Sequence, residues 1–103
     1  MKILERDILQ DGTAIQIEEW SEDFRIFPYG STVAAFPTKY MRVRAEANFK
    51  NHIDAKATFD KLIDGSMDVT DVDFTIMQPG GKRVLLKPIL DERRRKILEP
   101  KQP

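Results

Sequence analysis

The sequence predicts an α+β fold, in which an antiparallel sheet of about five or six strands packs against one main helix, with a short C-terminal helix. Three patterns lead to this prediction. Glycine turns at Asp11-Gly12 and Pro79-Gly80-Gly81 each separate two apolar stretches, as in β-hairpins. Residues 40–49 alternate between apolar and polar side chains, whereas residues 55–63 carry apolar side chains at helical spacing. Strands joined by tight turns favour antiparallel pairing, which leaves the helices on one face of the sheet.

The first hairpin is expected to pair residues 3–9 with residues 13–20. Asp-Gly supplies the positive φ angles of a two-residue type I′ turn, so Asp11 and Gly12 should join the two strands directly. The second strand alternates regularly between apolar and polar side chains. The first strand also fits the apolar stripe of a helix, and its pattern alone leaves both interpretations open.

Three further strands are expected before the main helix. Residues 24–27 and 32–36 are short apolar stretches, and Pro37 ends the second of them. Residues 40–49 have the strongest strand pattern in the chain. The core face of this strand should carry Met41, Val43, Ala45, Ala47 and Phe49.

The main helix is expected over residues 52–64. Asn51 or Asp54 can cap its start, and Gly65 stands where a left-handed residue commonly ends a helix. Phe59 and Leu62 belong to its apolar stripe. We expect this stripe to pack on the sheet, against Met41, Val43 and Phe49.

A second hairpin and a final helix follow. Residues 72–76 and 82–87 flank the Pro-Gly-Gly turn and are expected to pair. Pro88 suits the first turn of a helix, and Pro100 would end it. The apolar stripe of this helix is narrow and consists of Leu90, Ile97 and Leu98.

The 103 residues contain no repeat and no Gly/Ser linker, so residues 1–99 are expected to form one domain, followed by a short tail at 100–103. The absence of cysteine rules out disulfides and is usual for cytoplasmic proteins. Charges interrupt the N-terminal segment, and no apolar run approaches the ~20 residues of a membrane span. We therefore expect a soluble cytoplasmic protein that does not bind membranes.

Charge is balanced over the whole chain. The 17 basic and 17 acidic residues cancel, so the molecule as a whole does not attract nucleic acid or acidic membranes. Residues 38–50 and 78–103 are net basic, while the segments between and before them are net acidic. This alternation is typical either of surface patches of opposite sign or of an evenly solvated exterior.

The sequence gives little support to catalysis. His52 is the only histidine, and its place in the first turn of the predicted helix is typical of a surface residue. The Gly-x-Ser-x-Gly pattern of a nucleophile elbow is absent, and the glycines match neither a P-loop nor a dinucleotide-binding fingerprint. We assign no catalytic residue, no metal ligand and no cofactor; an enzyme of unidentified type remains the last of three functional alternatives.

Acidic side chains gather in one stretch of the chain, at Asp64, Asp68, Asp71 and Asp73. Carboxylate oxygens of this kind bind Ca²⁺ and Mg²⁺. The stretch lacks the central glycine and distal glutamate of an EF-hand, and aspartate is also favoured in caps and turns. The sequence leaves open whether this cluster holds a cation.

Nucleic-acid binding is the first alternative function. Arginines project from the polar side of the long strand and basic residues follow one another in the last helix, which are two elements that could contact phosphates. The candidate residues are Arg42, Arg44, Lys50, Arg93, Arg94, Arg95 and Lys96.

Protein binding is the function that we hypothesise first, largely because the chemistry of the other classes is missing. Trp20 lies on the polar face of its strand, where it either covers the sheet or stands exposed as an anchor for a partner. The final helix could dock through Leu90, Ile97 and Leu98 on a partner, on a second copy of this chain, or back on the sheet.

One resemblance accompanies these patterns. The run from Asp11 to Phe24, DGTAIQIEEWSEDF, and the run from Pro28 to Pro37, PYGSTVAAFP, resemble small uncharacterised proteins carried by mobile elements and phages of Gram-positive bacteria. The resemblance covers about the first third of the chain and includes no named functional motif. It implies a bacterial cytoplasm and an accessory role, and it assigns no site residue.

Overall fold

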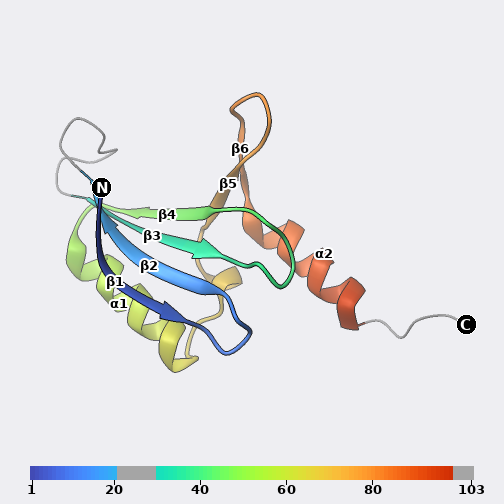
Figure 1. Ribbon diagram of the computed structural model, residues 1–103, viewed down its shortest axis with the longest axis horizontal. Helices are drawn as coiled ribbons and strands as arrows, with labels where there is room; N and C mark the ends of the chain where they lie inside the picture. Colours follow the sequence, from blue (N-terminus) through green and yellow to red (C-terminus); the bar gives the residue numbers. More distant parts are fainter. Residues whose placement is uncertain (21–29, 99–103) are drawn as a thin grey trace, which may run out of the picture.

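The computed structural model describes residues 1–20 and 30–98, the last of these by its backbone only. The described residues form one antiparallel sheet in the order β1-β2-β3-β4-β5-β6, with α1 between β4 and β5 and α2 after β6 (Figure 1). This confirms the α+β prediction. The predicted strand at 24–27 lies outside the described residues. The elements are β1 (Lys2–Ile8), β2 (Ala14–Glu19), β3 (Ser31–Phe36), β4 (Ala45–Phe49), α1 (His52–Asp64), the 3₁₀ helix η2 (Val69–Asp71), β5 (Thr75–Met77), β6 (Arg83–Leu85) and α2 (Leu86–Leu98).

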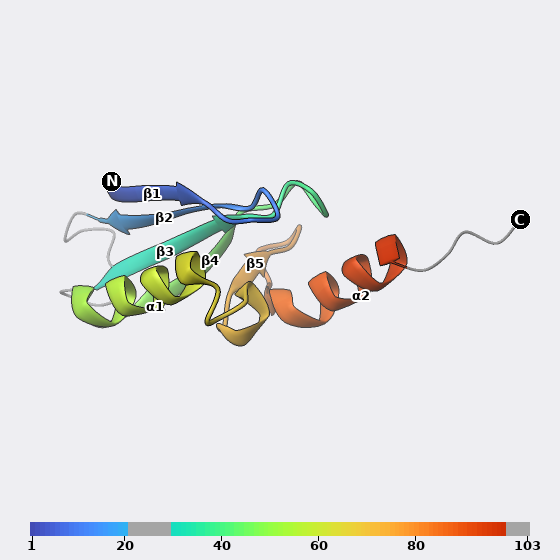
Figure 2. The same cartoon turned by 90° about the horizontal axis from the view of Figure 1, so that it is seen from below.

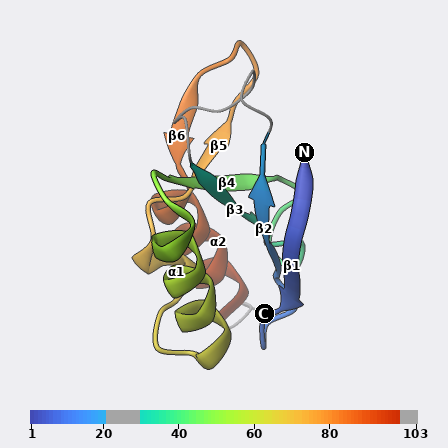
Figure 3. The same ribbon diagram turned by 90° about the vertical axis from the view of Figure 1, so that its left-hand side faces the viewer.

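Both helices lie on the same side of the sheet. Figure 3 shows α1 and α2 together on one side, with β1 as the outermost strand on the other. Helix α1 packs against β2, β3 and β4, whereas α2 contacts η2 and runs away from the sheet (Figure 2). The sheet therefore has one covered face, which holds the core, and one face without a helix.

The strand register explains which residues form the core. Ile17 lies opposite Val33, which lies opposite Ala47, so that all three point toward the helices. Ile15, Ala35 and Ala45 form the next row on this face. Small alanines in β3 and β4 leave room for the large side chains that α1 places against them. The buried residues contributed by the helices and the C-terminal part are Ala55, Phe59, Leu62, Val69, Phe74, Ile76, Leu86 and Leu90.

The first hairpin forms with a different turn from the predicted one. The extended alternative for the first stretch is confirmed, and β1 pairs with β2 from Lys2 opposite Glu19 to Ile8 opposite Ala14. The turn, however, is closed by the Gly12 N–H donating to the Leu9 carbonyl over 2.9 Å, and no described residue other than glycine has a positive φ. A type I′ turn at Asp11-Gly12 is thus wrong, because it needs positive φ at both residues.

The long strand predicted over 40–49 is also shorter in the structure. Only Ala45–Phe49 form β4, and the Tyr40 and Met41 amides donate to the Pro37 carbonyl in a turn. The neighbouring strand β3 ends at Phe36, with Ala35 opposite Ala45, so earlier residues have no strand to pair with. Met41 and Val43 nevertheless reach the core as partly buried side chains.

Helix α1 forms as its sequence predicts. The Asn51 side chain accepts a hydrogen bond from the Asp54 N–H over 2.8 Å, and Gly65 ends the helix with a φ of 83°. Phe59 and Leu62 are buried in the core, against which Met41, Val43 and Phe49 also pack. The predicted contact between this helix and the sheet is confirmed.

The C-terminal part combines a confirmed hairpin with an earlier helix start. Strands β5 and β6 pair around the Pro-Gly-Gly turn, although each is three residues long and shorter than predicted. Residues 69–71 form η2 before the strand, and α2 begins at Leu86 directly after β6. Pro88 lies in the first turn of α2, where its missing N–H is not needed.

Candidate functional site

The face of the sheet opposite the helices is one candidate surface, which we call the open face. No helix or strand among the described residues covers it (Figure 3). Its side chains follow from the register, since residues directly opposite each other share a face. The open face carries Ile3, Arg6, Ile8, Ala14, Gln16, Glu18, Thr32, Ala34, Phe36, Glu46, Asn48, Thr75, Met77, Arg83 and Leu85.

A hydrogen-bonded ion pair occupies the middle of the open face. Glu18 of β2 is fully buried, with 0% of its surface exposed. Arg44, just before β4, donates to both carboxylate oxygens of Glu18, over 2.7 and 2.5 Å. The Arg44 Nε donates to Glu46 over 2.8 Å. One arginine thus bridges a carboxylate of β2 and a carboxylate of β4 across β3.

Further polar contacts extend this pair toward both edges of the sheet. Gln16 Nε2 donates to Glu18 over 2.6 Å and its Oε1 accepts from Arg6 of β1. At the other end, Arg83 of β6 donates to Glu46 over 3.0 Å and to Thr75 over 3.2 Å. The open face therefore carries a polar ladder from β1 to β6, which ties the strands together without leaving free charge at its centre.

The ladder changes the acidity of its buried carboxylate. Burial alone raises the pKa of Glu18, but the hydrogen bonds from Arg44, Gln16 and Trp20 outweigh it, so the pKa is lowered overall. Hydrogen bonds to Glu18 and, to a smaller extent, to Glu46 raise the pKa of Arg44, so its guanidinium stays charged. Glu18 is thus an ionised structural partner and not a proton donor or acceptor near neutral pH.

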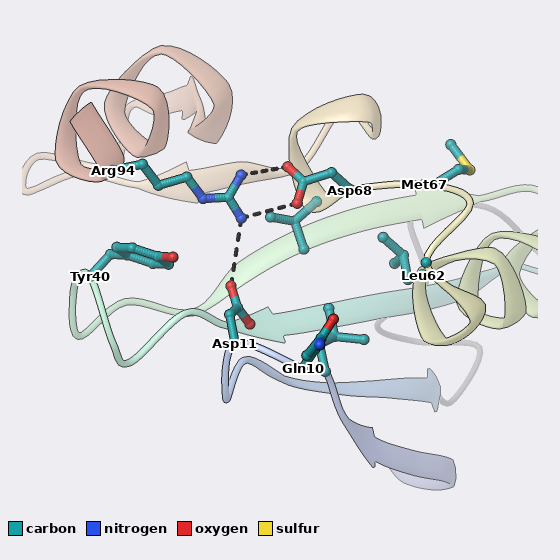
Figure 4. A pocket seen from close by; sticks show the side chains of 10 residues that line it. Gln10, Asp11, Tyr40, Leu62, Met67, Asp68 and Arg94 are labelled. Atoms are coloured by element: carbon teal, nitrogen blue, oxygen red, sulfur yellow. Dashed lines mark hydrogen bonds and ion pairs between the residues drawn. The ribbon is translucent and has the colours of Figure 1, made fainter. Parts of the chain in front are cut away.

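The second candidate site is a cavity of about 290 Å³ between the first hairpin, η2 and α2 (Figure 4). Arg94 of α2 donates to the two oxygens of Asp68 over 2.5 and 3.0 Å, and lies 3.6 Å from Asp11. Its guanidinium carbon is 5.3 Å from the centre of the Tyr40 ring. The apolar part of the cavity is lined by Leu9, Leu62, Met67 and Val69.

This cavity is built around a structural clamp. Partial burial raises the pKa of Asp68, but hydrogen bonds from Arg94 and Thr70 outweigh this and bring it down to about 2. Asp68 also caps η2 by accepting from the Thr70 N–H. Arg94 therefore holds α2 against η2 and the first hairpin, and its positive charge is balanced by the carboxylates of Asp68 and Asp11.

Among the described residues, the histidine and the acidic stretch do not gather into one site. His52 lies exposed at the start of α1 and does not line the cavity. Asp64 accepts hydrogen bonds from Ser66, and the Asp71 carboxylate accepts from the Asp68 N–H, so the acidic stretch is used in local turns and caps. Over residues 1–20 and 30–98, no three acidic or histidine side chains converge in a group able to hold a metal ion.

The structure separates the residues suggested for nucleic-acid binding. Arg44 and Arg94 are held by carboxylates, as described above. Lys96 lies 3.5 Å from Glu92, while Arg42, Lys50 and Arg93 are exposed. Arg44 precedes β4 and Lys50 follows it, so that the two lie about 20 Å apart along the strand. The suggested cations do not form one continuous basic surface.

The residues suggested for protein binding have three different environments. Trp20 is half-buried and its side chain hydrogen-bonds to Glu18, so it belongs to the open face. Leu90 is 0% exposed and packs in the core, where no partner can reach it. Ile97, at 53% exposed, lies beyond the part of α2 that contacts the core, and the side chain of Leu98 is outside the described part. The three leucine and isoleucine residues thus do not form one exposed stripe.

A third feature is the outer edge of β1, which the sequence reasoning did not single out. β1 has seven residues, is the first strand in the sheet order, and is mostly exposed. Its Ile3 and Ile8 are 39% and 67% exposed on the open face. A usable signal was present: four of its seven residues are charged, which is typical of an edge strand.

Comparisons with protein-family models, with curated proteins and with solved structures find no match to this chain. Within the described part, no helix has the length and apolar character needed to cross a bilayer.

Proposed function

We propose that this protein acts by binding another protein at the outer edge of β1. The observation that carries the proposal is the combination of a long terminal strand with exposed apolar side chains. An edge strand presents main-chain N–H and C=O groups that can pair with an added strand. At the opposite end of the sheet, β6 is only three residues long, so β1 is the better template.

The other functions considered have less support. The ionised Glu18 and Asp68 are each neutralised by an arginine, so neither is poised for acid-base catalysis near neutral pH. Three of the seven cations suggested for nucleic-acid binding, Arg44, Arg94 and Lys96, form ion pairs with carboxylates. We place the activity in a reducing cytoplasm, because the chain has no cysteine, and regard it as an accessory role.

Affinity capture with matched variants tests this proposal. The tagged wild-type protein is compared with Ile3→Lys/Ile8→Lys, which places two charges on the exposed apolar residues of β1. The control is Ile53→Lys/Ile63→Lys, which makes the same change at exposed positions of α1. We expect a protein from the host-cell lysate that the wild type and the control capture and the β1 variant does not.

Two results would count against the proposal. If all three proteins capture the same set from the lysate, the edge of β1 is not the binding surface. If only nucleic acid is retained, an anisotropy titration with duplex and single-stranded DNA and RNA follows at two salt concentrations. Salt-sensitive binding that is lost on reversing the charges of Arg93, Arg95 and Lys96 would then put nucleic acid first.

A further inference from the structure

From the charge order of β1, we infer that its partner is an extended segment of another protein with the pattern apolar-basic-acidic-basic, paired antiparallel to Glu5–Ile8. This inference rests on the proposed function and specifies the partner's chemistry. The pairing places an apolar residue opposite Ile8, basic residues opposite Asp7 and Glu5, and an acidic residue opposite Arg6.

The stretch from Glu5 to Ile8 is the regular part of the strand. The register with β2 shifts between Ile3 and Glu5, which marks a β-bulge, and is continuous from Glu5 to Ile8. Arg6 and Ile8 point to the open face, opposite Gln16 and Ala14 of β2. Glu5 and Asp7 point to the helix side. A partner strand here meets one basic side chain on the open face and two acidic side chains on the helix side.

The two central charges are already held in place. Glu5 lies 2.7 Å from Lys56 of α1, and Arg6 donates to Gln16 over 3.2 Å. Asp7 accepts from the Ile8 N–H over 2.7 Å, so an arriving strand must displace this carboxylate before it can pair with the Ile8 amide. Because Glu5 and Arg6 are held within the monomer, the arriving strand meets these two charges in a defined order and need not immobilise them itself.

The same order of charges disfavours pairing with a second copy of this chain over Glu5–Asp7. Two identical antiparallel strands related by a two-fold axis perpendicular to the sheet place one residue opposite its own copy. Centred on Glu5, Arg6 or Asp7, that arrangement opposes identical charges. Like charges directly opposite each other destabilise a strand pair. The charges on β1 thus disfavour self-pairing in the registers centred on these three residues, while a segment of complementary order is attracted.

Two peptides of identical composition test the inference on the full-length protein. One contains Val-Lys-Glu-Lys and the other Val-Lys-Lys-Glu, within the same flanking residues. In the second peptide, lysine faces Arg6 and glutamate faces Glu5. We expect the first peptide to bind about tenfold more tightly in a fluorescence anisotropy titration, because two attractive pairs become repulsive. Raising the salt concentration should reduce the difference in affinity between the two peptides, because salt screens the charge pairs.

An exchange of two residues in the protein gives the matched control. The variant Glu5→Arg/Arg6→Glu keeps the composition of the chain and should prefer the second peptide. Arg6→Glu alone, at an exposed position, should shift the preference in the same direction if the double variant does not fold. Loss of peptide binding in Ile3→Lys/Ile8→Lys would place the contact on the strand.

The outcomes separate this inference from the proposed function. The inference that the partner's charges complement those of β1 is called the charge rule below. Three results would each overturn it: equal affinity of the two peptides, no binding of either, or a dimer of the wild-type protein that dissociates in the Arg6→Glu variant. If the lysate partner is still captured through Ile3 and Ile8, the proposed function stands while the charge rule fails. If that capture is also insensitive to Ile3 and Ile8, both fail.

Discussion

Thr13, at the base of the first hairpin, has a fully buried side chain whose Oγ1 has no hydrogen-bond partner among the described residues. Burying a hydroxyl without a partner costs free energy, and valine has nearly the same shape without the polar group. We expect Thr13→Val to raise the free energy of unfolding by about 1 kcal/mol, measured by urea unfolding. A loss of stability instead would indicate that a buried water satisfies the hydroxyl.

Glu18 and Arg44 illustrate a buried charge that depends on one partner. Arg44→Met leaves the fully buried carboxylate with only neutral hydrogen-bond partners, so we expect a loss of about 3 kcal/mol in urea unfolding. The double variant Arg44→Met/Glu18→Gln should recover most of this loss, because no charge then remains buried. A loss below about 1 kcal/mol, or a double variant no more stable than the single one, would show that Glu18 is solvated.

Arg94 should make the stability of the protein depend on pH. The pKa of Asp68 is about 2 in the folded state, against 3.8 for a free aspartate. A lowered folded pKa contributes stability above pH 3.8, and this contribution is lost as the pH falls from about 4 through about 2. Arg94→Leu should cost about 1 kcal/mol at neutral pH, since the ion pair is partly exposed.

The pH dependence supplies the control for this prediction. The difference in free energy of unfolding between wild type and Arg94→Leu should shrink over that acidic range, as Asp68 takes up its proton. Arg93→Leu, at the exposed neighbouring position, should show no such change. A difference that stays constant down to pH 2 would mean that Asp68 is not the titrating partner.

At the scale of an element, α1 stabilises the sheet through one large side chain. Phe59 is 2% exposed and belongs to the same buried cluster as the small alanines of β3 and β4, which cannot fill the space that its removal would leave. Phe59→Ala should therefore cost ~3–5 kcal/mol in urea unfolding. Ile53→Ala, on the solvent side of the same helix, should change stability by less than about 0.5 kcal/mol. Equal effects of the two substitutions would show that α1 does not pack as described.

The elements predicted best are those whose start and end are both determined by residues within the element or next to it. Helix α1 is such a case, since Asn51 caps it and Gly65 ends it within the same segment. Strand β4 was predicted too long because its alternation continues before Ala45, although β3 ends at Phe36 and offers no partner there. The first turn was assigned the wrong type because Asp-Gly occurs both in type I′ turns and in turns where only the glycine has a positive φ. The φ angle of Asp11 distinguishes the two, and the sequence does not determine it.

At the scale of the whole molecule, the contacts that define the candidate sites join residues far apart in the chain. Glu18 and Arg44 are 26 positions apart, as are Asp68 and Arg94. No local period links such residues, so the arginines could be predicted only as exposed cations. The edge position of β1 likewise depends on the order of all the strands in the sheet. Its many charges were visible in the sequence, but their meaning required that order.

Amide hydrogen exchange tests the central claim most directly, because it reports which strand gains hydrogen bonds when the protein binds. The wild-type protein is measured alone and with the partner isolated by affinity capture. We predict that the amides of β1 exchange more slowly in the complex, particularly over residues 5–8, while those of the exposed end of α2 are unchanged. Slower exchange confined to residues 93–97, with β1 unaffected, would contradict binding at the edge of the sheet.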